Sequence, residues 1–161
     1  FESLQQRVGL LKGLDFSVVE KISQNLPYMP GAVETIAELK RRGLTVVCFS
    51  GGFRTATGHA KSILGYDADF SNVLHEKDGV LTGLVGGDMM FSHSKGDMLE
   101  RLQNILGVTE QETLVCGDGA NDLSMFAHAG IRVAFCAREI LEKEANIIIK
   151  EKDLTQILEK I

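Results

Sequence analysis

Two carboxylates and one carboxamide stand close together in the run Gly117-Asp118-Gly119-Ala120-Asn121-Asp122. The apolar residues 113–116 before it are typical of a buried parallel strand, and a helix is expected from about Asn121 to Ala129. In open α/β sheets, ligands bind where strands end and helices begin. Asp118 and Asp122 would repel each other on so short a loop unless a cation or buried hydrogen bonds offset the charge. A hard, oxygen-binding cation such as Mg²⁺ is the natural partner.

A second candidate is the run Ser50-Gly51-Gly52, which follows an expected strand at 44–49 and precedes an expected helix that ends near Leu64. Backbone N–H groups in such a position can point at an anion, and the Ser50 hydroxyl adds a donor. A tight turn that only packs helix on strand is the simpler interpretation. The anion-binding hypothesis gains weight because the Asp118 loop should open on the same edge of the sheet.

Two basic residues complete the candidates. Lys95 begins an expected helix, where a solvated surface lysine is the ordinary finding. The alternative is that Lys95 reaches the same crevice and neutralises a phosphate as a point charge. Arg7 lies on the polar side of the first expected helix and is by default a surface charge. If that helix covers the crevice, its guanidinium could hold a substrate carboxylate through two hydrogen bonds.

The elements that must position these residues alternate along the chain. Helices are expected at 1–11, 16–26, 32–42, 53–64, 95–106, 121–129, 138–144 and after Asp153, and strands at 44–49, 70–74, 80–85, 113–116, 131–135 and 145–149. Uniformly apolar strands between helices predict an α/β fold with a doubly wound, Rossmann-like parallel sheet. Asp78-Gly79 predicts the turn of a β-hairpin insert. Both prolines fall at 27–30, which predicts a boundary between a small helical part, residues 1–29, and an α/β core, residues 30–161.

Composition narrows the classes of function. The 161 residues carry a net charge of −5, which argues against general affinity for nucleic acid or anionic membrane. No apolar run approaches the ~20 residues that span a bilayer, and no signal peptide is visible. Cys48, Cys116 and Cys136 lie in apolar runs without metal-ligand spacing, so we interpret them as small buried hydrophobes in a reducing compartment, by default the cytoplasm. Oligomeric state is left open.

Several short stretches together resemble a known family. They are, in chain order, Ser50-Gly51-Gly52-Phe53, Lys95-Gly96 and Gly117-Asp118-Gly119-Ala120-Asn121-Asp122. These resemble motifs two, three and four of the haloacid dehalogenase superfamily, and the fit is closer still to its phosphoserine phosphatases. Residues 7–12 are similar to the late cap helix of those enzymes, and residues 131–137 to the strand that follows motif four. Residues 1–29 would then be part of a helical cap.

The resemblance implies a role for each candidate. Asp118 would be a Mg²⁺ ligand, and Asp122 would orient the metal shell or Lys95. Phosphate oxygens would be held by a group of polar donors, namely Ser50, the Gly51 backbone, Asn121 and Lys95. Arg7 would bind the carboxylate of phosphoserine.

The implied reaction is Mg²⁺-dependent dephosphorylation of O-phospho-L-serine to L-serine, as used in serine biosynthesis. The phosphoryl group would pass to an enzyme aspartate and then to water, so that two easier steps replace one difficult attack. Lys95 and Ser50 would take part in catalysis by stabilising charge on the transferring group.

One family motif is missing. The first motif, Asp-x-Asp-x-Thr, supplies the nucleophile and the general acid/base, and none of the 161 residues matches it; Asp67-Ala68-Asp69 is followed by Phe70-Ser71. In the family this motif ends the central strand of the sheet, and a sheet without that strand would expose two apolar edges. Because the chain also begins with Phe1 inside a helical pattern, we expect a further N-terminal segment in the native protein and no turnover from these residues by themselves.

Three alternatives remain. The protein could be a related capped phosphatase for another small phosphomonoester, in which case Arg7 has no carboxylate to bind. It could be a non-catalytic fragment that binds a phosphorylated ligand. It could also be a plain α/β scaffold in which the acidic loop is structural.

Overall fold

The computed structural model describes residues 2–161; Phe1, where the first helix was expected to begin, lies outside the described residues. By their contacts the residues divide into two compact units. Unit 1 comprises the chain up to Tyr28 together with Ile36–Phe91, and unit 2 comprises Met29–Thr35 together with Ser92–Ile161. Each unit contains one three-stranded sheet.

The sheet of unit 1 has the order β1-β2-β3. Strand β1 (Val47–Phe53) is parallel to β2 (Ala68–Lys77), and β2 forms an antiparallel hairpin with β3 (Val80–Gly87). The two residues of the hairpin turn, Asp78 and Gly79, both have positive φ, at 53° and 81°. Such φ values are those of the tight turn that an Asp-Gly pair favours, so the predicted hairpin is confirmed.

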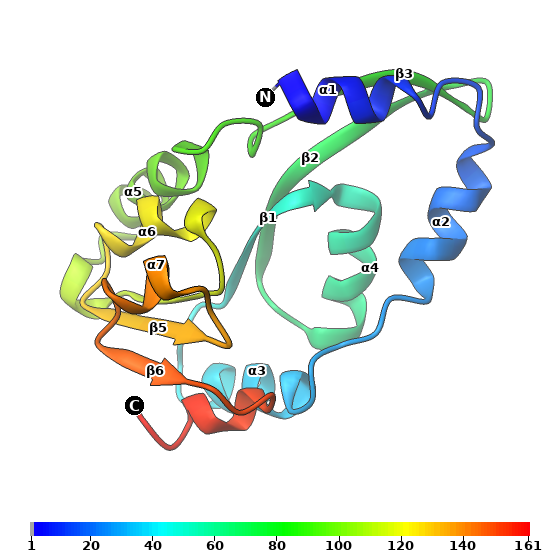
Figure 1. Cartoon of the computed structure of the whole chain (residues 1–161). Coiled ribbons are helices and arrows are strands. Elements are labelled where there is room, and N and C mark those ends of the chain that lie inside the picture. Colours follow the sequence, from blue (N-terminus) through cyan, green and yellow to red (C-terminus); the bar gives the residue numbers. More distant parts are fainter. Residues whose placement is uncertain (1) are drawn as a thin grey trace. The chain divides into compact units, whose positions relative to one another are not determined.

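Helices cover this sheet (Figure 1). Helix α4 (Arg54–Leu64) packs against β1 and β2, α1 (Glu2–Gly9) packs against β3, and α2 (Phe16–Gln24) contacts α4. A small core joins α1 to the hairpin through Val8, Leu74 and Leu81. The chain passes between the units at three places, one of which, after Thr35, lies within helix α3 (Ala32–Arg41).

The sheet of unit 2 is entirely parallel, with the order β4-β5-β6. Its strands are β4 (Leu114–Gly117), β5 (Ile131–Phe135) and β6 (Ile147–Ile149). The helices are α5 (Ser94–Leu106), α6 (Leu123–Phe126) and α7 (Glu139–Glu142), and 3₁₀ turns follow at Glu110–Glu112, Ala120–Asp122 and Leu154–Ile157. Their core is built from Val133, Phe135, Ile149 and Ile157, which are nearly or completely buried.

The predicted α/β class is confirmed, with its strands in two separate sheets among the described residues. Several expected boundaries differ by a few residues, and two of the differences concern the candidate site. Ser50-Gly51-Gly52 was expected as a turn but lies within β1, because pairing with β2 continues to Phe53 across an irregularity in register. The helix expected at 121–129 is a 3₁₀ turn followed by the single turn of α6. The division into a cap at 1–29 and a core at 30–161 differs from these two units and stays a prediction.

The interpretation of all three cysteines as buried is wrong. Cys116 is exposed, and Cys48 and Cys136 are half-buried. An apolar run was taken to be covered on both faces, but among the described residues β4 pairs only with β5 and is an edge strand. Over residues 2–161, none of the helices has both the length and the apolar character needed to cross a bilayer.

Candidate active site

A buried ion pair forms the base of the site in unit 2. The Lys95 Nζ lies 2.6 Å from the Asp122 Oδ1, and the two residues are 8% and 3% exposed. Lys95 is in the first turn of α5 and Asp122 directly precedes α6, so the pair joins two helices that pack together. The ordinary expectation of a solvated surface lysine therefore does not hold for Lys95, since a buried ammonium needs such a partner.

The second oxygen of Asp122 is also occupied. The Asp122 Oδ2 accepts hydrogen bonds from the backbone N–H groups of Asp118, at 3.0 Å, and Gly119, at 3.2 Å. Three donors thus surround one carboxylate, and one of them is a charged ammonium. With both oxygens engaged, Asp122 fixes the shape of the loop and the position of the Lys95 ammonium.

Two glycines make this close packing possible. A Cβ on Gly96 would lie 2.5 Å from the Ser124 carbonyl oxygen, and one on Gly117 would lie 2.6 Å from the Asp122 side chain. The Gly96 N–H also donates to the Ser124 Oγ at 3.1 Å. Any larger residue would push α5 from α6, or Asp122 from its strand, and would separate the two members of the ion pair.

Asp118 and Asn121 form the exposed rim above this base. The Asp118 carboxylate accepts no hydrogen bond from any of residues 2–161, whereas its backbone carbonyl accepts one from the Arg138 N–H at 3.0 Å. A free carboxylate on a fixed loop is a suitable ligand for Mg²⁺, which commonly takes one or two carboxylates and completes its shell with water and phosphate. No group of three or more His, Cys, Asp or Glu gathers around one point in the described part of the chain. Asp118 would therefore be one ligand among several.

Cys116 stands two residues before Asp118 on β4. Loss of water around the thiolate, followed by the charges of Asp122 and Asp118, raises the pKa of Cys116 to about 12, although part of the side chain is exposed. The thiol is thus protonated at neutral pH. A raised pKa makes Cys116 a poor nucleophile, because the thiolate is the reactive form.

Ser50 and Gly51 belong to unit 1. The Ser50 Oγ accepts a hydrogen bond from the Gly52 N–H at 3.0 Å, which fixes the hydroxyl over its own backbone. The Gly51 carbonyl accepts a hydrogen bond from the Asn72 Nδ2 at 3.1 Å. Gly51 is exposed and open to a ligand.

Asn72 is a residue that the sequence analysis missed. It lies on β2 and is completely buried. Its side chain also binds the Met89 backbone: the Asn72 Nδ2 donates to the Met89 carbonyl at 3.2 Å, and the Asn72 Oδ1 accepts from the Met89 N–H at 3.0 Å. Asn72 thereby ties the Ser50-Gly51 segment to the chain that leaves β3. A polar residue inside an expected strand was the only available signal.

Arg7 is exposed on α1, and its Nε donates to the Ser3 carbonyl on the same helix at 3.2 Å. Its guanidinium makes no ion pair within residues 2–161. Arg7, Ser50 and Gly51 thus fall in unit 1, whereas Lys95, Asp118, Asn121 and Asp122 fall in unit 2. The structure brings together Lys95, Asp122 and the Asp118 backbone. The shared edge expected for the Ser50 run and the Asp118 loop stays a prediction.

Comparison with known proteins identifies the family. The family model described as haloacid dehalogenase-like hydrolase matches residues 3–130. The chain belongs to the haloacid dehalogenase-like hydrolases. The motifs at Ser50, Lys95 and Asp118 all lie inside the matched range.

Individual relatives of this hydrolase carry a narrower name. A protein of Wolinella succinogenes named phosphoserine phosphatase is 58% identical over 158 residues, which cover 98% of this chain and 77% of that protein. A solved structure titled as a phospho-aspartyl intermediate analogue of phosphoserine phosphatase has a TM-score of 0.94 and 46% identity, covering 99% of this chain and 77% of that one. A substrate-bound phosphoserine phosphatase structure has the same TM-score and identity and is covered to 76%. The resemblance to phosphoserine phosphatases of this family is confirmed.

Proposed function

We propose that this hydrolase is a Mg²⁺-dependent phosphoserine phosphatase that converts O-phospho-L-serine to L-serine in the cytoplasm, as a step of serine biosynthesis. The observation that carries the proposal is the buried Lys95–Asp122 pair beneath the Asp118 loop. The Lys95 ammonium has three N–H donors and gives one to Asp122, so it can donate another to a phosphate oxygen. The names of the relatives give the substrate class.

In this proposal each side chain acts at a stated atom. The Lys95 ammonium, held by the Asp122 Oδ1, offsets the charge on the transferring phosphoryl group. The Asn121 amide, the Ser50 hydroxyl and the Gly51 N–H donate to phosphate oxygens. Asp118 supplies a carboxylate ligand to Mg²⁺, which when bound offsets charge on phosphate oxygens as a Lewis acid.

The reaction would proceed in two displacements. An enzyme aspartate attacks phosphorus, the bond from phosphorus to the serine oxygen breaks, and that oxygen takes a proton from the general acid of the same motif. Water then hydrolyses the acyl phosphate, gives its proton back to that group, and inorganic phosphate is released. We propose that this aspartate lies in an Asp-x-Asp-x-Thr segment outside these 161 residues, since no such run occurs among them. The phospho-aspartyl analogue solved for a 46% identical protein supports this route.

The test is phosphate release from O-phospho-L-serine by the native protein with Mg²⁺ and with chelator. Asp118→Asn should remove activity, and Asp88→Asn, which changes an exposed aspartate of unit 1, should not. Activity without added or bound divalent cation would contradict the metal role. Calorimetric binding of phosphate without turnover would favour the alternative of a phospho-ligand binding fragment.

Arg7 distinguishes the substrate. If its guanidinium binds the substrate carboxylate, Arg7→Ala should raise KM for phosphoserine and leave phosphoethanolamine, which has no carboxylate, unaffected. Lys12→Ala is the matched control, because it removes another exposed charge at the end of the same helical segment. Equal losses for both substrates would favour a phosphatase for another phosphomonoester.

A further inference from the structure

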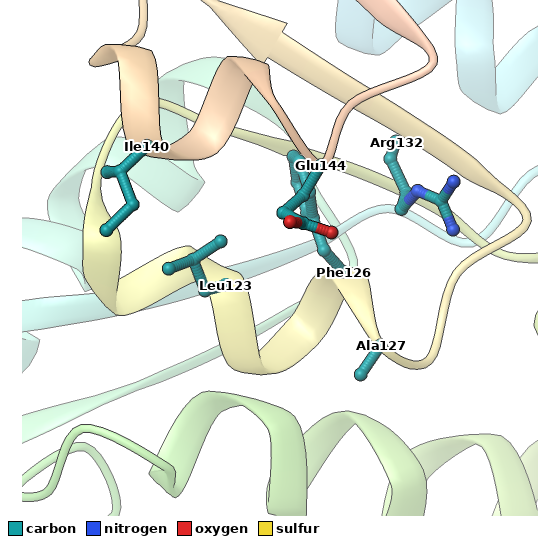
Figure 2. Close-up of a pocket in the computed structure, with 6 residues that line it drawn as sticks. All are labelled: Leu123, Phe126, Ala127, Arg132, Ile140 and Glu144. Atoms are coloured by element: carbon teal, nitrogen blue, oxygen red, sulfur yellow. The ribbon is translucent and has the colours of Figure 1, made fainter.

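Unit 2 contains a pocket that the proposed reaction does not use. Its cavity volume is about 330 Å³, and it is lined by Leu123, Phe126, Ala127, Arg132, Ile140 and Glu144 (Figure 2). These residues come from α6 and the residue after it, from the beginning of β5, and from α7 and the turn that follows. All six belong to the same unit.

The pocket is separate from the Asp118 loop. Arg132 pairs with Val115 near the beginning of the parallel strands, whereas the loop follows Gly117 at the end of β4. Leu123 is the one lining residue beside the candidate active site, since it directly follows Asp122 in the chain. None of the seven candidate site residues lines the pocket.

The pocket has one polar and one apolar side. In Figure 2 the Glu144 carboxylate points toward the side where Arg132 lies, and Ile140 and Leu123 lie on the other side. No ion pair joins Arg132 to Glu144 in the part of the chain that is described, although both line the same cavity. The Arg132 Nε is buried and lacks a hydrogen-bond partner. Among the buried side-chain nitrogen and oxygen atoms of residues 2–161, the Thr35 Oγ1 is the other one without a partner.

The buried Nε–H of Arg132 is unfavourable without an acceptor, because it has lost water and gained no hydrogen bond, whereas the side chain as a whole is half-buried. Arg132 also lines the cavity, and a carboxylate there can accept two parallel hydrogen bonds from a guanidinium. Glu144 on the same wall would repel a simple anion but would attract an ammonium group. The two charges together therefore select a ligand that carries both signs on neighbouring atoms.

We propose that this pocket binds a free α-amino acid with an apolar side chain. Its carboxylate pairs with Arg132, its ammonium group with Glu144, and its side chain packs against Leu123, Phe126 and Ile140. A volume of about 330 Å³ is at the small end of ligand pockets, which suits a molecule of this size. The proposal does not depend on the proposed phosphatase function.

The test is isothermal titration calorimetry of the whole protein with L-leucine. Two analogues each remove one charge: leucinamide has no carboxylate, and 4-methylpentanoic acid has no ammonium group. We expect each to bind at least about tenfold more weakly than leucine, the effect of losing one charge-assisted interaction. Absence of leucine binding at about 10 mM, or equal binding of all three compounds, overturns the proposal.

Substitutions in the pocket test which side chain binds each charged group of the ligand. Arg132→Gln should weaken leucine about tenfold without affecting leucinamide, and Glu144→Gln should weaken leucine without affecting the acid. Arg101→Gln and Glu151→Gln, which change exposed residues outside the pocket, are the matched controls. Ile140 is 51% exposed, so Ile140→Glu should fold normally while placing a carboxylate on the apolar side and abolishing binding. Leucine binding that survives Arg132→Gln and Ile140→Glu would place the ligand elsewhere and refute the assignment.

Discussion

Asn72 allows a sharp test of how the Ser50-Gly51 segment is held. It is completely buried and makes three hydrogen bonds, two as donor through Nδ2 and one as acceptor through Oδ1. At about 1 kcal/mol for each bond, Asn72→Ala should lower the free energy of unfolding by about 3 kcal/mol, and the cavity adds to this loss.

Asn72→Asp should be more damaging at neutral pH, although it is nearly identical in shape. A carboxylate oxygen would replace the amide NH₂ and face the carbonyl oxygens of Gly51 and Met89. Burial and this repulsion would raise the pKa of the introduced carboxyl group. With a raised pKa, the carboxyl group keeps its proton to higher pH in the folded protein than in the unfolded chain. The free energy of unfolding of Asn72→Asp should therefore fall as pH increases. Its protonated form also regains one O–H donor.

Urea unfolding at pH 7 and pH 5 provides the measurement. The difference in stability between the wild type and Asn72→Asp should shrink at pH 5, whereas Asn72→Ala should show no such change. Hydrogen exchange at the Met89 amide adds a local readout, since Asn72→Asp keeps its acceptor and Asn72→Ala removes it. Asn104→Asp, on the exposed surface of α5, is the control. An Asn72→Asp protein as stable as Asn72→Ala at both pH values would refute the reasoning.

Three further outcomes are expected. Lys95→Met should lower the free energy of unfolding by about 3–5 kcal/mol in denaturant titrations, because it leaves the Asp122 charge buried without its ammonium partner. Asp118→Asn should change stability by less than about 0.5 kcal/mol in the same titrations and remove Mg²⁺ binding measured by calorimetry. Burial raises the pKa of Tyr66 well above its ordinary value, so stability should be complete below about pH 10 and fall above it. Tyr66→Phe should remove that alkaline loss, whereas Tyr28→Phe, at a partly exposed tyrosine, should retain it.

The regular elements could be predicted where one local cause dominates. The run at 131–135 is apolar except for Arg132, and β5 has those bounds. The Asp78-Gly79 turn was predictable because two positive φ values suit these residue types. The prediction of a turn at Ser50-Gly51-Gly52 was wrong, because this segment is held as a strand by pairing with β2, about twenty residues later in the chain. Tertiary pairing overrode the local preference of glycine and serine.

The interior of the site was less accessible to sequence reasoning. Lys95 and Asp122 are 27 residues apart in the chain. The sequence around either residue does not indicate that the other will form an ion pair with it. Polarity predicts exposure for lysine in general, and the exception depends on a partner brought by the fold. Asn72 was missed for the same reason, because Met89 becomes its partner only when the chain returns after β3. The resemblance to family motifs singled out Lys95 but carried no information on Asn72.

Asp122 and Asp118 lie on the same loop, but we expect Asp122 to contribute mainly to folding stability and Asp118 mainly to ligand binding. Asp122 is buried and satisfied by Lys95 and two backbone N–H groups, so its interactions exist without any ligand and contribute to folding. Asp118 is exposed and its carboxylate accepts no hydrogen bond within residues 2–161, so its side chain adds no such interaction to folding. Substitutions of Lys95 or Asp122 should therefore mainly lower the free energy of unfolding, and substitutions of Asp118 or Asn121 should mainly weaken ligand binding. A variant of Asp118 that loses stability as severely as Lys95→Met would show that the rim, too, is part of the folded framework.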